Sequence, residues 1–502
     1  MNMHKFYHYI NAMQQRNTKQ AIKVVWLNED ETPNVEFTND LYNMSGSLTV
    51  NYQNGARRSC TITLSNDNGK FPVDCNNIWL GQKFQLWSGI YLDDGTPFYL
   101  SQGIFYIKNP KEVYDPKNRT LTLQGVDKWA YLDGSLFGYL RGTYVSQINQ
   151  DIRDLTQGLI NKSKYTNDFS ITNNTSHRID PKNAIFRGFE KDSSTADVQA
   201  YEKQTGNPVF YDSESKNYFV ITNTMTDGKE NSEYKVCEQI PITNPDNASE
   251  IMYYDYKIKL DDKNLPEILD TTPTNYTYVT TKQSIFLNPY TVTTEAGKTL
   301  ADIILEYATI LFADVYYDEL GYLCFEARDR SLQNQSISNK EIIWNFSVQE
   351  KEMLKLELTN SFDTVYNDII VLGQIIGGKQ MKARIQNQDP LSETNIERIG
   401  IKTKPPYESD QYYSNQLCLD LASYYAQLDM ALDRSGTLKT IPIHHIDVNK
   451  LITVSTPNNN MSSEKFLVTG YTLPLNLIGE MSLNISNIRY FSNWTDVSSS
   501  LE

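Results

Sequence analysis

The stretch from Ser361 to Tyr490 constrains the fold more than any other part of the chain. It opens with an extended apolar run over 365–373, and a later stretch over 410–434 places leucines and tyrosines at helical spacing and ends at Gly436. Four further extended segments follow this helix: 442–449, 450–454, 466–471 and 481–488. Extended segments on both sides of one amphipathic helix predict a β-barrel interrupted by a helix.

The N-terminal part of the sequence has a β pattern throughout. From Ala21 to Gly134, short segments alternate or run apolar, and Asn-Gly pairs at 54–55 and 68–69 supply tight turns between them. Strands this short and this regularly spaced favour a barrel or a sandwich.

A short polar-aromatic helix is expected ahead of this β part, over 3–18. Phe6, Tyr9, Ile10 and Met13 recur there at helical spacing. Because a helix of this length is not stable alone, the sequence leaves two outcomes: the segment frays, or it docks on a neighbouring subunit.

The middle of the chain combines helices with hairpins. A helix is expected to begin near Thr143, with an apolar stripe over 148–159 and with Thr143 or Ser146 as its cap. The remainder, to about residue 290, is rich in Asn, Thr, Ser and Asp, and we interpret it as peripheral.

A weak internal repeat lies in this middle part. At 194–221 and again at 299–325, a Ser or Thr with Asp three residues later opens a helix, and an apolar-aromatic hairpin follows. Each copy would cover one face of a sheet. Duplication is the favoured hypothesis, and chance similarity is the alternative.

Length and charge exclude several classes of protein. The 502 residues suggest three or four domains. The net charge of −15, with no basic cluster longer than Arg57-Arg58, disfavours sequence-specific nucleic-acid binding, whereas an acidic surface lets DNA slide past without sticking. No run of about 18 apolar residues and no apolar signal-peptide core is present, so we expect no membrane insertion and folding in the cytoplasm where the chain is made.

No metal-binding residue is predicted. Five cysteines are scattered without a CxxC or Cys/His cluster, and we expect reduced thiols packed in sheets: Cys60, Cys75, Cys237, Cys324 and Cys418. The adjacent His444 and His445 would point to opposite faces of a strand, so they could not hold one metal ion together.

No catalytic or cofactor-binding residue is predicted either. The carboxylate pairs at 93–94 and 261–262 lie in turn-like contexts, and the glycine pair at 377–378 is interpreted as a turn rather than a phosphate loop. HExxH, GxSxG, Walker A and GxGxxG motifs are absent. We therefore do not expect an enzyme.

The order of several motifs resembles the hub proteins of phage tail tips and baseplates, including those of related contractile bacteriocins. No single piece is specific, but their order over 21–134 and 297–490 is. The pieces are 84–89 (FQLWSG), 103–107 (GIFYI), 123–134 (LQGVDKWAYLDG), 315–323 (VYYDELGYL), 366–373 (YNDIIVLG), 396–400 (IERIG), 444–449 (HHIDVN), 472–475 (TLPL) and 479–483 (GEMSL).

This resemblance implies a mainly β fold with α+β insertions, in which two β-barrel tube-type domains flank peripheral helix-hairpin domains. The expected divisions are an N-terminal helical arm (1–20), a first barrel (21–135), a peripheral α+β region with an insertion (136–296), a helix-hairpin module (297–338), a second barrel containing helix 410–434 (339–495) and a tail (496–502).

The resemblance also implies a homotrimer without cofactors, located in the virion at the tail tip or baseplate. Six similar barrels would form a ring of near six-fold symmetry, joining the hexameric tail tube, or a distal tail protein, to a trimeric spike or needle. The ring would meet the C-terminus of the tape-measure protein and line a channel through which DNA passes without specific binding.

Two features depart from many relatives. Residues 160–290 resemble an insertion, which we expect on the outer rim. The sequence ends at Glu502 without a lysozyme-like, peptidase or fibre extension, so cell-wall cleavage and receptor binding are expected in other proteins.

Two alternatives stay open. The 34 tyrosines and the Asn-rich strands also suit a monomeric carbohydrate-binding or carbohydrate-cleaving β-protein. Within the hub interpretation, the insertion could instead make contact with the host.

Overall fold

A computed structural model describes most of the chain. The described residues are 3–13, 18–67, 69, 71–74, 78–79, 81–115, 119–148, 150–161, 180–189, 209–212, 217–225, 233–244, 247–260, 266–274, 286, 288–328, 342–347, 352–361, 365–376, 378–430, 433–456, 461–476, 479–487 and 494–501. Within these ranges, no helix is both long and apolar enough to cross a lipid bilayer.

The mainly β fold class predicted from the sequence is confirmed, and its largest sheet has fourteen strands. The N-terminal part contributes β1 (Gln20–Leu27), β2 (Pro33–Thr38), β3 (Ser45–Asn51), β4 (Arg58–Ser65), β5 (Lys83–Tyr91), β6 (Pro97–Ile107), β7 (Lys111–Tyr114) and β8 (Arg119–Asp127). The closing part contributes β19 (Ile342–Ser347), β20 (Met353–Ser361), β24 (Asp433–Thr440), β25 (Leu451–Thr456), β26 (Met461–Pro474) and β27 (Met481–Asn487). A short helix, α2 (Asn39–Tyr42), follows β2.

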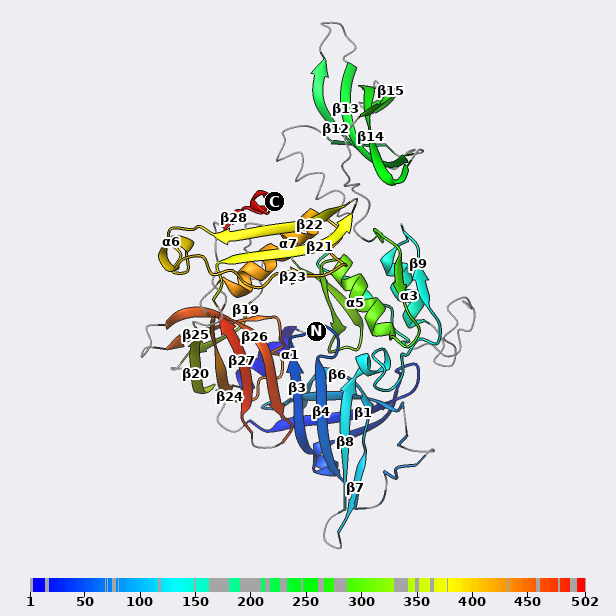
Figure 1. The fold of residues 1–502 in the computed structure, drawn as a ribbon. Coiled ribbons are helices and arrows are strands. Elements are labelled where there is room, and N and C mark those ends of the chain that lie inside the picture. The colour runs from blue at the N-terminus through cyan, green and yellow to red at the C-terminus, as the bar shows by residue number, and fades with distance from the viewer. Residues whose placement is uncertain are drawn as a thin grey trace.

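The two parts of the chain are joined edge to edge in this sheet. The strand order is β2-β1-β5-β6-β8-β4-β3-β26-β27-β24-β20, with β7 beside β8, β25 beside β26 and β19 beside β25. Figure 1 shows the strands from β20 to β8 side by side. The order does not return to its first strand, so the described strands form one open sheet where the sequence predicted two closed barrels.

One apolar core lies on one face of this sheet and includes both parts of the chain. Leu48 and Leu123 from the N-terminal strands and Leu438 and Leu483 from the closing strands are fully buried in the same cluster. This apolar face arises because successive side chains of a strand point to opposite sides of the sheet. Along β4, for example, every second residue is buried.

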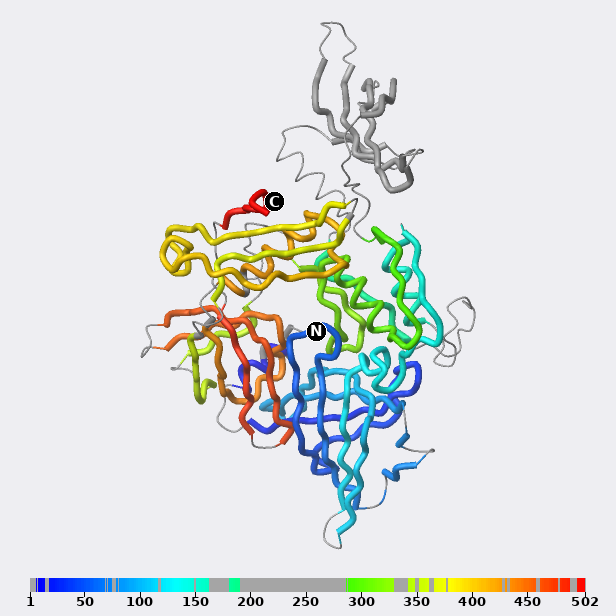
Figure 2. The backbone as a smooth tube through the Cα atoms, viewed as in Figure 1, coloured from blue at the N-terminus to red at the C-terminus, as the bar shows by residue number. Residues whose placement is uncertain are grey.

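The N-terminal helix α1 (Met3–Met13) packs against its own chain. Tyr9 and Met13 are buried in the shared core, and the Tyr9 ring stacks on Phe98 with centroids 5.1 Å apart. Figure 2 places the N-terminal end near the centre of the molecule. The expectation that this segment frays or docks on a neighbouring subunit is therefore wrong, because its apolar face completes this chain's core.

The run over 365–373 does not join the large sheet, although the sequence analysis placed it in the closing barrel. It leads into β21 (Asp368–Ile376), which forms a separate sheet with β23 (Tyr407–Glu408), β22 (Lys379–Asn387) and β28 (Trp494–Asp496). A 3-10 turn, η3 (Ser498–Ser500), follows β28 beside β22. Alternation along a strand predicts a buried face, but it does not identify the sheet that the strand joins.

Helix α7 (Asn415–Asp429) packs against β21 and β22. It is shorter than the predicted 410–434, because the Ser414 side chain accepts a hydrogen bond from the Leu417 amide and begins the helix there. The segment 442–449, predicted as a strand, contains turns instead. A further short helix, α6 (Ile396–Ile399), lies in the loop after β22.

Substitution of Ile369 by aspartate is expected to prevent folding, whereas the same change at Ile370 should be tolerated far better. Ile369 is fully buried in the core shared by β21 and α7, whereas Ile370 is only partly buried, and an unpaired buried carboxylate costs several kcal/mol. Soluble yield and circular dichroism of the two variants check this. Equal behaviour would contradict the assigned strand faces.

The middle part differs from the prediction at its first helix. Where the helix was expected, β9 (Tyr144–Ser146) pairs with β16 (Val292–Thr294). The helix itself, α3 (Ile152–Ile160), begins later because Asp151 caps it by accepting from the Arg153 amide. Ile148, expected in the apolar stripe, precedes α3 and is exposed.

The helix-hairpin at 299–325 is confirmed. Thr299 and Asp302 form the predicted capping box of α5 (Leu300–Ile310), and β17 (Ala313–Tyr317) pairs with β18 (Leu323–Ala327) beside β10 (Ile185–Arg187). The other proposed copy has the expected hairpin of β11 (Val209–Asp212) and β12 (Asn217–Met225), within a sheet that adds β13 (Glu233–Asn244), β14 (Asn247–Leu260) and β15 (Pro266–Thr274). Its helix at 194 lies outside the described residues, so the duplication stays a hypothesis.

Candidate functional surface

The seam between the two parts of the chain lies at the pairing of β3 with β26. The pairs run from Ser47 opposite Pro474 to Asn51 opposite Gly470. Gly470 lies close to the neighbouring strand, because a Cβ there would be 2.9 Å from the Asn51 side chain and 3.2 Å from the Val50 carbonyl oxygen. Close backbone contact therefore makes the surface continuous across the seam.

We call the face of this sheet opposite the core the polar face. Its residues are hydroxyl- and amide-bearing side chains drawn from β8, β4, β3, β26, β27 and β24. They are Thr120, Thr122, Gln124, Ser59, Thr61, Thr63, Ser65, Ser45, Ser47, Thr49, Asn51, Thr472, Ser482, Asn484, Ser486, Ser435 and Thr437. They alternate with the buried residues of the core.

Strand register places these side chains in rows that cross the seam. In one row, Ser59 lies opposite Thr49, Thr49 opposite Thr472, and Thr472 opposite Ser482. Cross-strand hydroxyl pairs of this kind stabilise a sheet. The surface is therefore built jointly by residues from the two ends of the sequence.

Among its described residues, the polar face carries one charged side chain from β8 to β27, that of Lys465, which lies two residues before Leu467, the partner of Ser486. Further charged residues lie toward the ends of the face, at Lys439 of β24, at Lys355 and Glu357 of β20, and at Lys111 of β7, which lies opposite Thr122. The net charge of −15 therefore does not come from the described polar face. A hydrated face with few charges does not hold a polyanion tightly, because it releases few counterions.

A buried ionic cluster fixes the N-terminal strands to the helix-hairpin. Lys128 Nζ lies 2.7 Å from Glu31 Oε1 and 2.7 Å from Asp180 Oδ1, and it donates to the Gly321 carbonyl at 2.8 Å. Burial alone would raise the pKa of Glu31, but Lys128 and Lys83 outweigh burial and hold that pKa below its ordinary value. Lys128 lies in η1 (Lys128–Tyr131), directly after β8.

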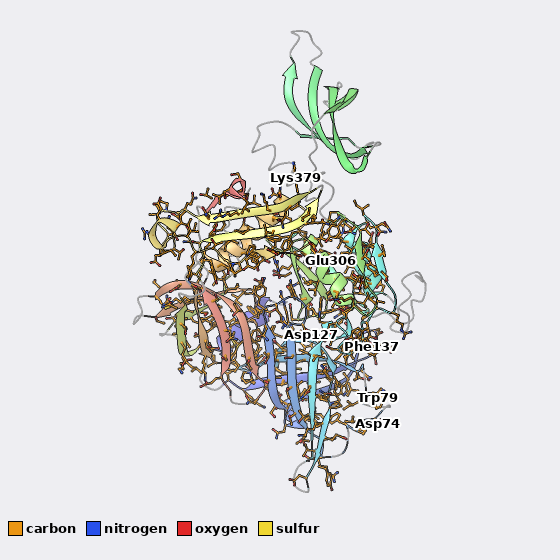
Figure 3. All side chains as sticks on the ribbon, in the orientation of Figure 1. Asp74, Trp79, Asp127, Phe137, Glu306 and Lys379 are labelled. Carbon is orange, nitrogen blue, oxygen red and sulfur yellow. The ribbon has the colours of Figure 1, made fainter. Side chains whose placement is uncertain are left out.

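Asp127, at the end of β8, organises the turn beside this cluster (Figure 3). Its carboxylate accepts hydrogen bonds from the backbone amides of Arg57, Arg58 and Trp129. Burial raises the pKa of Asp127 to about 6, against the lowering effect of these amides. The Arg58 guanidinium also lies 2.6 Å from Asp447, so it connects the N-terminal strands to the closing part.

The histidine pair also lies between the two parts. His444 Nδ1 is 2.9 Å from Ser88 Oγ, its backbone amide donates to Tyr9 Oη at 3.0 Å, and His445 Nδ1 is 3.2 Å from Tyr9 Oη. Burial lowers the pKa of His444 to about 3 and that of His445 to about 4. Both rings are therefore neutral at pH 7 and act in packing and hydrogen bonding.

The carboxylate pairs, the glycine pair and the cysteines that the sequence analysis considered have the following positions. The pair at 93–94 lies in an exposed turn, where Asp94 accepts from Thr96. The pair at 261–262, Gly377 and Cys75 lie outside the described residues, and Cys237 lies in β13 opposite Val220 of β12. Among the residues that the structure describes, no group of three or more His, Cys, Asp or Glu could hold a metal ion, and Cys60, Cys324 and Cys418 are buried and unpaired by disulfides.

Comparison with solved structures finds similarity to tail proteins. A tail protein of Neisseria meningitidis MC58 matches with a TM-score of 0.46 and 10% identity, covering 93% of this chain and 97% of that one. The 43 kDa tail protein of prophage MuSo2 from Shewanella oneidensis matches with a TM-score of 0.46 and 10% identity, covering 93% and 98%. Prophage tail protein gp18 from Listeria monocytogenes EGD-e matches with a TM-score of 0.41 and 9% identity, covering 92% and 94%.

All three neighbours are tail proteins, and two of them come from prophages. That is the class of protein which the sequence resembles. No protein-family model matches the sequence, and no curated protein sequence matches it.

The sequence analysis missed the polar face as a surface. Each strand showed the alternation of apolar with Ser, Thr or Asn residues that contributes to it, for example over 59–65 and 481–487. What the sequence could not show is that strands so distant in the chain are neighbours, because register and partner are set by the assembled core.

Proposed function

We propose that this chain is a structural hub of a phage tail tip or baseplate, and that it acts as a homotrimer whose polar faces line a channel for DNA. It would join a hexameric tail tube or distal tail protein above to a trimeric spike or needle below, and it would meet the C-terminus of the tape-measure protein. In this proposal the chain performs no catalysis, binds no cofactor, and functions in the virion after synthesis in the host cytoplasm.

The observation that carries the proposal is the continuous polar face. A sheet with a core on one side and a hydroxyl-rich surface with few charges on the other suits the wall of a conduit, since a polyanion is neither held tightly by such a wall nor repelled from it. Ring formation would also cover the open ends of the sheet. The ordered motifs that resemble tail hubs support the same conclusion.

The division of labour follows from this arrangement. Residues 21–135 and 339–495 would supply the two tube-type units of each copy, giving six units around the ring. Residues 136–296 and 297–338 would lie peripherally, with the arm over 1–20 holding the two units together and 496–502 forming the tail.

Electron microscopy of the purified protein, combined with its mass in solution, tests the proposal. We expect a three-fold ring with six lobes around an open channel, and a mass three times the 57.7 kDa of one chain. The polar face should border the channel.

Two other outcomes would favour the alternatives. A stable monomer that binds glycan would overturn the hub and support a carbohydrate-binding or carbohydrate-cleaving protein. A ring whose region 160–290 binds host cells would retain the hub and assign it a contact with the host.

A further inference from the structure

Lys128 and Asp180 form a buried pair of opposite charge whose members come from separate segments. Lys128 lies in η1, and Asp180 lies 52 positions later, ahead of β10. Their side chains are 2% and 0% exposed, and Lys128 Nζ lies 2.7 Å from Asp180 Oδ1. An ammonium and a carboxylate taken out of water lose their hydration, and their mutual attraction often fails to offset this loss. A reaction that turns both groups neutral is therefore favoured at this site.

The cluster around this pair contains more positive than negative groups. Glu31 Oε1 lies 2.7 Å from Lys128 Nζ and 3.1 Å from Lys83 Nζ. The other carboxylate oxygen of Glu31 lies 3.2 Å from Lys182 Nζ. Three lysines thus share the carboxylates of Glu31 and Asp180. Because like charges disfavour the charged form, such a cluster favours loss of a proton from one lysine, which becomes a nucleophilic amine.

We propose that Lys128 and Asp180 become joined by an amide bond between the lysine Nζ and the aspartate Cγ, with Glu31 as the proton carrier. The reaction is a condensation within one chain, and it needs no oxidant, reductant or cofactor. The product is a covalent link between the end of β8 and the segment ahead of β10. This link goes beyond the proposed hub and does not depend on it.

Three contacts hold the lysine nitrogen in position for the reaction. Lys128 Nζ donates to Asp180 Oδ1, contacts Glu31 Oε1, and donates to the Gly321 carbonyl at 2.8 Å. Transfer of the first proton to Asp180 leaves a neutral amine beside a neutral carboxylic acid. The two hydrogens that remain on the amine stay directed at Glu31 and Gly321, so its lone pair faces the Asp180 carboxyl group.

The bond then forms with atoms and charges in balance. The nitrogen attacks Cγ of Asp180, and Glu31 accepts one proton from the nitrogen. Glu31 gives this proton to the Asp180 hydroxyl, which leaves as water, so one C–N bond forms, one C–O bond breaks and Glu31 regains its initial charge. Well-oriented groups within one molecule reach effective molarities of about 10⁵–10⁸ M. Burial of all three side chains also keeps bulk water from reversing the reaction.

The mass of the intact, full-length chain tests the proposal. We expect denatured wild type, after prolonged incubation of the folded protein, to be lighter than its sequence mass by one water molecule. Tryptic digestion should then release one branched peptide that contains Lys128 and Asp180, because trypsin does not cleave after an acylated lysine. Lys128→Arg keeps the positive charge but removes the primary amine, so this variant should keep its full mass.

Two further variants examine the proton carrier. Glu31→Gln retains both reacting groups and the shape of the side chain, and it should slow the loss of water by roughly 10²-fold or more. Lys182→Arg is the matched control, because Lys182 also contacts Glu31 but takes no part in the reaction. This control should lose water at the rate of wild type. Circular dichroism shows whether each variant has folded.

The wild-type mass decides the outcome whether or not a variant folds. A full sequence mass after prolonged incubation would overturn the proposal and leave a buried ion pair only. A loss of water that maps to residues other than Lys128 and Asp180 would overturn it equally. Loss of water from folded Glu31→Gln at the wild-type rate would remove Glu31 from the reaction. The number of copies in the particle is a separate measurement, so failure of the hub and failure of this link are distinguishable.

Discussion

Replacement of Lys128 by methionine is expected to lower the free energy of unfolding by about 3–5 kcal/mol, the usual result of removing one partner from a buried ion cluster. The Lys128 side chain is 2% exposed and contacts Glu31, Asp180 and the Gly321 carbonyl at once. Without it, Asp180, whose side chain is fully buried, loses its nearest cation, and three chain segments lose their common contact. Thermal or urea unfolding measures the change.

The control for this prediction is Lys379→Met, which removes a lysine from an exposed strand end. Surface substitutions of that kind change stability by about 0.5 kcal/mol or less. If Lys128→Met were no more destabilising than Lys379→Met, the buried cluster would not hold the N-terminal strands to the helix-hairpin.

Acidification from pH 7 to pH 5 is expected to destabilise the protein through the histidine pair. The folded-state pKa of His444 is about 3 and that of His445 about 4, below the ordinary 6.5, because both rings are buried. The two neutral rings contribute fully to the free energy of unfolding above pH 6.5. This contribution is lost as pH falls, because the two histidines take up protons more readily in the unfolded chain than in the folded one. For His444 alone the loss at pH 5 reaches about 2 kcal/mol.

Comparison of unfolding at pH 7 and pH 5 for wild type and His444→Asn isolates this effect. The asparagine variant, although less stable at pH 7, should lose less stability on acidification, whereas the exposed His8→Asn control should behave like wild type. Asp127 acts in the opposite direction. Burial raises its pKa to about 6, so the folded chain takes up this proton more readily than the unfolded chain, and the contribution of Asp127 to the free energy of unfolding increases as pH falls below 6. An unchanged pH slope in His444→Asn would contradict the role given to that ring.

Local features of the fold were predictable because they depend on neighbours in sequence. The capping box at Thr299 and Asp302 needs only the three-residue spacing, and the β character of the N-terminal part follows from period-two alternation. The strand at 365–373 was predicted as a strand but placed in the wrong sheet, since its apolar residues face α7 rather than the large core.

The candidate surface and the contacts that support it could not be predicted in the same way. Lys128, Glu31 and Asp180 come from three separate segments, and no pattern in the sequence brings a lysine together with those two acids. His444 and His445 were noticed as an adjacent pair in the sequence, but their partners, Ser88 and Tyr9, lie more than 350 positions away. Such contacts exist only once the chain has folded.

The seam between β3 and β26 has a consequence for synthesis. Asn51 and its partner Gly470 are about 420 residues apart in sequence, and ribosomes add roughly 5–20 residues per second. After β3 leaves the ribosome, its edge must wait roughly 20–80 s for the strand that covers it. Throughout that interval β3 is paired on one side only, with β4, and its other edge stays open, so the polar face is among the last surfaces of the chain to be completed.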